Sequence, residues 1–89
     1  MNRNGIPRQK IGYAFADLDG ECMVYSGAEA KALYLNDTAS LIWKLCDGQR
    51  TVATIEELLR AAYPDAERLR EDVAEAFHVL VEQGVVELQ

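Results

Sequence analysis

The sequence has few of the residues that build catalytic and metal centres. It contains one histidine, His78, and two cysteines, Cys22 and Cys46, in 89 residues. None of these has a second ligand residue at metal-binding spacing, and there is no Cys-x-x-Cys pair, so neither a zinc site nor a redox site is indicated. We therefore expect no catalytic residue and no metal. His78 is predicted to be an ordinary half-exposed helix residue, and the cysteines small apolar packing residues.

Long apolar runs and glycine-rich loops are also missing. No stretch approaches the ~20 apolar residues that span a bilayer, and the polar residues 1–10 precede no apolar export segment. The six glycines stand singly and never form a phosphate-binding loop. We expect a cytoplasmic protein with reduced thiols and no cofactor.

What is present suits one folded domain. Hydrophobic residues make up 49% and charged residues 27%, which is ordinary for a globular chain of this length. The formal net charge of −6 disfavours contact with nucleic-acid phosphates. No internal repeat or second domain is indicated.

The first half of the chain is predicted to form a loose arm and a small sheet. Residues 1–10 lack periodicity and are expected to be a flexible arm, with the domain covering residues 11–89. Two β-prone runs, residues 13–18 and 21–26, flank Asp19-Gly20, a dipeptide typical of a hairpin turn. Residues 30–35 alternate and predict a third strand, with Leu33 and Leu35 on one face and Ala32 and Tyr34 on the other.

Capping residues and glycines predict three helices in the second half. Asn36, Asp37 and Thr38 precede the first, which stops at Asp47-Gly48. Thr51 is the expected N-cap of the second, whose apolar face carries Val52, Ile55, Leu58, Leu59 and Ala62 and which ends before Pro64. The third is predicted from about Asp65 to Gly84, with an apolar face of Leu69, Val73, Ala76, Phe77 and Leu80. Val85, Val86 and Leu88 follow, as a short closing strand or packed under the helices. Trp43 is expected in the core or at a groove edge.

This order predicts an α+β fold: a three-stranded antiparallel sheet followed by a winged helix-turn-helix bundle of three helices. Such an outline raises DNA binding by a transcription regulator, or a role as a regulatory subunit, as an alternative. A recognition helix needs basic and amide side chains on its outer face. The third helix carries six acidic residues and only two basic ones, Arg68 and Arg70. DNA recognition is therefore less favoured than other functions.

The third strand is the candidate functional element. It is an edge strand with no proline and a single charge, Lys31, so its unpaired backbone groups are suited to accept a strand from a partner. The arm of residues 1–10 could equally cover this edge, and the pattern alone does not separate the two arrangements.

Several short motifs together resemble the PqqD family. They are Leu35-Asn36-Asp37-Thr38-Ala39 at the start of the first helix, the Asp47-Gly48 stop, and Asp-Val-x-x-x-Phe-x-x-Leu-x-x-x-Gly from Asp72 to Gly84. The likeness spans about residues 13–88. It implies a non-catalytic peptide chaperone, a recognition element that binds the leader segment of a ribosomally made precursor peptide and presents it to a modifying enzyme such as a radical-SAM protein.

The resemblance also implies the site. In such proteins the leader adds as a strand to the third strand and lies against the third helix. Carried over by position, the peptide-binding residues are Lys31, Ala32, Leu33, Tyr34, Leu35, Arg68, Leu69, Asp72, Val73 and Ala76.

Two departures concern the pathway. Members that serve pyrroloquinoline quinone synthesis usually carry a Pro-Glu-Gly-like segment before the third strand, where this chain has Ser26-Gly27-Ala28-Glu29, and they favour leucine at the position of Trp43. These differences favour the wider set of PqqD-like proteins over the quinone pathway itself.

Overall fold

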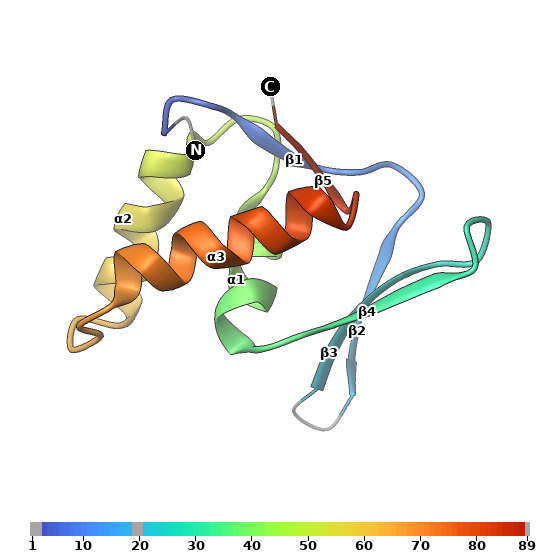
Figure 1. Ribbon diagram of the computed structural model, residues 1–89, viewed down its shortest axis with the longest axis horizontal. Coiled ribbons are helices and arrows are strands. Elements are labelled where there is room, and N and C mark those ends of the chain that lie inside the picture. The colour runs from blue at the N-terminus through green and yellow to red at the C-terminus, as the bar shows by residue number, and fades with distance from the viewer. Residues whose placement is uncertain (1–2, 19–20, 89) are drawn as a thin grey trace.

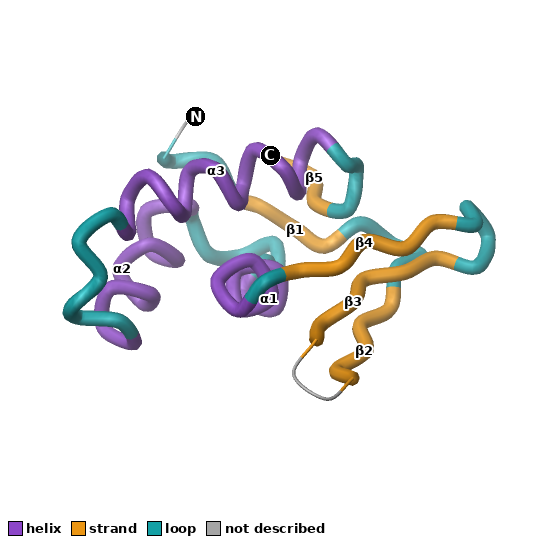
Figure 2. The backbone as a smooth tube through the Cα atoms, turned by 60° about the horizontal axis from the view of Figure 1, so that its bottom comes forward, coloured by secondary structure: helices purple, strands orange, loops and turns teal. Residues whose placement is uncertain are grey.

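The computed structural model describes residues 3–18 and 21–88 and contains two sheets and three helices (Figure 1). The elements are β1 (Pro7–Gln9), β2 (Ala14–Leu18), β3 (Glu21–Ser26), β4 (Lys31–Leu35), α1 (Asp37–Leu45), α2 (Val52–Ala62), α3 (Leu69–Glu82) and β5 (Val86–Leu88). The predicted order of three strands followed by three helices is confirmed. The sheet of β2, β3 and β4 projects to one side of the helices (Figure 2).

In the three-stranded sheet, β3 is central and pairs antiparallel with both neighbours. Leu35 lies opposite Cys22 and Leu33 opposite Val24, and both β3 residues are buried, so the predicted alternation of the third strand is confirmed. That strand begins one residue later than predicted, because Ala30 has a φ of 51° and closes a turn through its N–H bond to the Gly27 carbonyl (3.3 Å). The predicted Asp19-Gly20 turn lies outside the described residues.

The predicted N-cap Thr51 is confirmed, and of the three candidates before the first helix Asn36 is the N-cap. The Asn36 side chain accepts a hydrogen bond from the Ala39 N–H (2.8 Å), and the Thr51 hydroxyl accepts one from the Thr54 N–H (3.1 Å). Gly48 follows α1 with a φ of 80°, a left-handed conformation that suits glycine. The buried face of α2 is narrower than predicted, since Leu58 is 43% exposed and Ala62 is also exposed.

The third helix begins at Leu69, so the predicted start near Asp65 was wrong. Residues 65–68 are exposed and form turns, and the preceding turn is closed by the Ala66 N–H bond to the Tyr63 carbonyl (3.2 Å). No side chain of residues 63–68 is buried, so a helical turn there would gain no stability from packing against the core.

The N-terminal segment is packed onto the domain. β1 pairs antiparallel with β5, with Arg8 opposite Glu87, and the Gln9 N–H bonds to the Cys46 carbonyl (3.0 Å). The expectation of a loose arm therefore missed a strand, and packed structure begins before the predicted start at Ile11. Three residues are too few to show a strand period.

The core lies between α1, α2, α3 and the inner face of β3. Its fully buried side chains include Ile42, Ile55, Leu59, Phe77 and Leu80, each 0% exposed. Trp43 is also buried; it stacks on Phe15 with ring centroids 5.7 Å apart and donates from Nε1 to the Val85 carbonyl (3.3 Å). No helix in the described part of the chain is long and apolar enough to cross a membrane.

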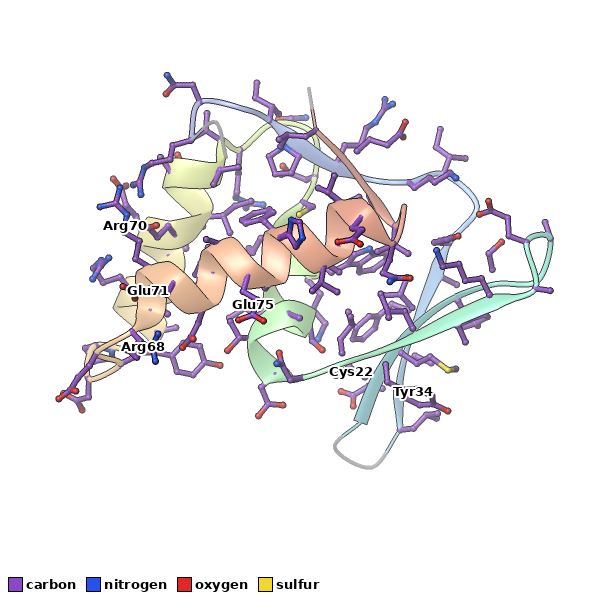
Figure 3. The ribbon with its side chains drawn as sticks, viewed as in Figure 1. Cys22, Tyr34, Arg68, Arg70, Glu71 and Glu75 are labelled. Carbon is purple, nitrogen blue, oxygen red and sulfur yellow. The ribbon has the colours of Figure 1, made fainter. Side chains whose placement is uncertain are left out.

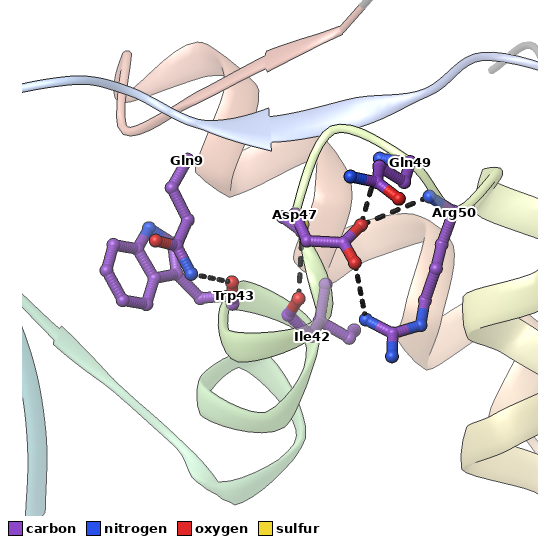
Figure 4. A network of polar contacts seen from close by, with 7 residues as sticks. Gln9, Ile42, Trp43, Asp47, Gln49 and Arg50 are labelled. Atoms are coloured by element: carbon purple, nitrogen blue, oxygen red, sulfur yellow. Dashed lines mark hydrogen bonds and ion pairs between the residues drawn. The ribbon is translucent and has the colours of Figure 1, made fainter.

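A polar network fixes the connection between α1 and α2 (Figure 4). The Asp47 carboxylate accepts hydrogen bonds from the Gln49 and Arg50 N–H groups (2.9 and 3.1 Å) and pairs with the Arg50 guanidinium (2.9 Å). The two backbone N–H groups and this charge hold the pKa of Asp47 below its ordinary value. On the other side of the turn, the Gln9 amide donates to the Trp43 carbonyl (2.9 Å). These contacts tie β1 to α1 and order the loop that leads into α2.

The two thiols are core groups. Cys46 is 0% exposed and its thiol donates to the Ile42 carbonyl (3.1 Å). Burial, reinforced by the Asp47 charge, raises the pKa of Cys46 to about 12. Cys22 is also buried, so the prediction that both cysteines act as packing residues is confirmed.

Replacement of Phe77 by alanine should lower the free energy of unfolding by about 3–5 kcal/mol, because a fully buried ring leaves a cavity. The measurement is urea denaturation followed by circular dichroism. Val81→Ala, at a position 38% exposed on the same helix, should change stability by no more than about 0.5 kcal/mol. Equal effects of the two substitutions would contradict the core described above.

Cys46 should resist alkylation in the folded protein. Because its thiol is buried and its pKa is about 12, iodoacetamide at pH 8 should modify it at least ~100-fold more slowly than in 6 M guanidinium. Peptide mass spectrometry measures the rate site by site. Rapid modification of Cys46 under native conditions would show an accessible thiol and contradict this packing.

Candidate functional site

One long edge of β4 has no strand beside it. In residues 3–18 and 21–88, the sheet order is β2-β3-β4, and the N-terminal strand β1 pairs with β5 instead. The arrangement in which the arm covers the β4 edge is therefore overturned for residues 3–10. The outward backbone N–H and C=O groups of β4 are left able to pair with another strand.

A cavity of about 370 Å³ lies next to this edge, where β4 ends, α1 begins and the middle of α3 passes. We call it the groove. The residues that line it come from these three elements and the turn between β4 and α1: Tyr34, Leu35, Asn36, Thr38, Ala39, Asp72, Glu75, Ala76 and Val79.

The groove has an apolar floor and an acidic rim. Leu35 and Ala39 are nearly buried at 8% and 9% exposed, whereas Val79 is 39% exposed and offers apolar surface. Asp72 and Glu75 are exposed at the rim. Their carboxylates have no hydrogen bond or ion pair with any described residue. Figure 3 shows Glu75 on the side of α3 that faces α1.

Lys31 marks the other end of β4. Its ammonium group donates a hydrogen bond to the backbone carbonyl of Gln83, at the C-terminal end of α3. Since Leu35, at the opposite end of β4, shares the groove with Asp72 and Ala76, β4 and α3 run past each other in opposite directions. The negative end of the helix dipole favours the lysine there.

The ten residues predicted as a peptide site fall into distinct places in the structure. Tyr34, Leu35, Asp72 and Ala76 line the groove. Ala32 is exposed on the opposite face of the sheet from Leu33, which packs against the core.

Leu69, Val73 and Arg68 do not line the groove. Leu69 and Val73 are 3% and 2% exposed and belong to the core under it. Arg68 is exposed just before α3 and lies, with Arg70 and Glu71, at the end of that helix away from the three-stranded sheet (Figure 3).

Five lining residues were not predicted: Asn36, Thr38, Ala39, Glu75 and Val79. On α3 the sequence did indicate such a face. Asp72, Glu75 and Val79 have the i, i+3, i+7 spacing of one helix face, and this face lies next to the buried one.

The described residues that line the groove include no histidine or cysteine. Among the described residues, no set of three or more histidine, cysteine, aspartate or glutamate side chains is placed to hold a metal ion. His78 is exposed, and its Nε2 lies 2.9 Å from the Glu82 carboxylate one turn along the helix, an ordinary surface pair. The arrangement is that of a binding surface.

Comparisons with known proteins agree with this description. The family described as "Coenzyme PQQ synthesis protein D (PqqD)" matches residues 21–86. A PqqA binding protein of Kluyvera intermedia is 37% identical, covering 93% of this chain and 90% of that protein. One of Pseudomonas aeruginosa PAO1 is 42% identical, covering 97% and 94%.

Two solved structures share the fold. One, described as TbiB1 in complex with the TbiA(beta) leader peptide, superposes with a TM-score of 0.73 at 18% identity, covering 90% of this chain and 94% of that chain. The other, a lasso peptide synthetase B1 complexed with the leader peptide, gives 0.74 at 25% identity, covering 92% and 98%. The family match over most of the chain, with relatives of this identity and coverage, shows that the chain belongs to the PqqD family.

Proposed function

We propose that this protein is a non-catalytic peptide chaperone that binds the leader segment of a ribosomally made precursor peptide as an added strand on β4. The observation that carries the proposal is the open edge of β4 beside a groove with an apolar floor. Added strands gain affinity from main-chain hydrogen bonds and selectivity from pockets that receive alternate side chains. Both components are available here.

The relatives support this assignment. The similar proteins from Kluyvera and Pseudomonas are named for binding PqqA, and both structural neighbours are described as complexes with leader peptides. The acidic, exposed surface of α3 favours no DNA-binding function.

The structure divides the proposed site into roles. The backbone of Lys31 to Leu35 provides the hydrogen bonds, and Leu35, Ala76 and Val79 provide apolar contact. Leu69 and Val73, which are buried, support the groove from beneath and hold α3 in place.

The charged residues Lys31, Asp72 and Arg68 act at the periphery, where they select among peptides more than they add affinity. Ala32 and Tyr34 lie on the face of β4 opposite to Leu33 and Leu35, and Tyr34 also borders the groove.

The partner that receives the bound peptide is proposed to be a peptide-modifying enzyme such as a radical-SAM protein. No metal-ligating cluster occurs in the described residues, and membership of the PqqD family supports a role in holding a substrate for the chemistry of another protein. The cargo is proposed to be PqqA or the precursor of a related peptide product; the sequence before β4 and Trp43 favour the latter.

An amide chemical-shift titration tests the site. The labelled protein is titrated with PqqA of Kluyvera intermedia and, separately, with the short peptides encoded beside the gene of this protein. With at least one of them, shifts should concentrate on Lys31 to Leu35 and on Asp72 to Val79, where the added strand lies. Saturable shifts confined to other surfaces, or no binding by any of these peptides, would contradict the proposal.

The apolar floor can be tested by a matched pair of substitutions. Val79→Glu should weaken binding of the same peptide at least about tenfold, because it places a charge where an apolar side chain is received. Val81→Glu should leave the affinity within about twofold. The two valines are 39% and 38% exposed on one helix, and only Val79 lines the groove. Isothermal titration calorimetry gives both values, and equal losses would place the peptide elsewhere.

A further inference from the structure

The faces of β4 determine which side chains of an added strand meet α3. Leu33 and Leu35 lie opposite the buried residues Val24 and Cys22, so they face the helices, and Lys31 shares their face because strand side chains alternate. Residues of an added strand that lie directly opposite Lys31, Leu33 and Leu35 point to the same face. Three alternate side chains of the cargo therefore turn toward α3.

These three positions meet different surroundings. At the Leu35 end, the carboxylates of Asp72 and Glu75, which pair with no described residue, lie at the rim above the apolar floor. The middle position lies over Leu33, which packs against the core.

At the other end is the ammonium of Lys31, which gives one of its three donors to the Gln83 carbonyl. It also helps to lower the pKa of the nearby Glu29 carboxyl, which is ion-paired with Lys10. The charge along the space between the β4 edge and α3 therefore changes sign from one end of β4 to the other.

We infer that the space between the β4 edge and α3 selects an added strand in which three alternate residues are basic, apolar and acidic. The basic residue lies beside Asp72 and Glu75, the apolar residue over Leu33, and the acidic residue beside Lys31. This inference rests on the proposed strand addition and deepens it by stating the class of cargo. The pattern holds for either strand direction: a strand antiparallel to β4 reads from basic to acidic, and a parallel strand reads from acidic to basic.

Selection from a random peptide library tests the pattern. A displayed library of fifteen-residue peptides is selected against the immobilised wild-type protein, and enriched sequences are aligned. We expect a basic and an acidic residue four positions apart, the separation of Leu35 and Lys31, with an apolar residue midway. Each favourable charge should improve affinity by about two- to fivefold, the range for exposed ion pairs, and 0.5 M salt should reduce the gain.

Charge-reversed variants identify the residues responsible. The double variant Asp72→Lys/Glu75→Lys should replace the basic preference by an acidic one, and Lys31→Glu should replace the acidic preference by a basic one. The control Glu67→Lys/Glu71→Lys makes the same change in net charge with two exposed acids that do not line the groove. It should keep the wild-type pattern.

The outcomes separate this inference from the proposed function. Enriched peptides that shift the β4 amides but show no alternating charge pattern would overturn the inference and leave strand addition standing. Enriched peptides that leave the β4 amides unshifted would contradict both. A control variant that changes the preference as strongly as Asp72→Lys/Glu75→Lys would assign the effect to overall charge and overturn the inference as well.

Discussion

The pairing of β1 with β5 is the contact on which the open edge of β4 depends. Backbone hydrogen bonds and the ladder from Pro7 to Gln9 hold the N-terminal segment against the C-terminal strand, and the Arg3–Glu56 ion pair (2.9 Å) anchors it again on α2. A segment held at both points is not available to cover β4. The free backbone edge is thus a consequence of how the two ends of the chain are joined.

Helix α3 connects this edge to the stability of the domain. One of its faces supplies Val73, Phe77 and Leu80 to the core, and the adjacent face supplies Asp72, Glu75 and Val79 to the groove. The rigid packing of the first face therefore sets the distance between the second face and β4. A binding surface built in this way is held in place before a peptide arrives, which reduces the ordering cost of association.

Much of this arrangement could be predicted from the sequence, because it depends on local signals. Asn36 and Thr51 are capping residues, and the alternation before α1 shows which face of β4 is buried. The sequence did not predict β1, because a strand of three residues has no measurable period. The predicted start of α3 near Asp65 was too early, because acidic residues favour the first turn of a helix without fixing where it begins. The resemblance pointed to β4 and α3, two of the elements that border the groove. It could not separate the buried Leu69 and Val73 from the groove residues Glu75 and Val79, since that depends on the rotation of α3 over β4.

The most direct test of strand addition is an isotope-filtered nuclear Overhauser experiment on the saturated complex with a bound leader peptide. Strand addition predicts a continuous series of backbone contacts between the peptide and Lys31 to Leu35, together with contacts from alternate peptide side chains to Val79 and Ala76. A peptide whose backbone instead contacts β2, the other edge of the sheet, or contacts α3 without β4, would contradict it.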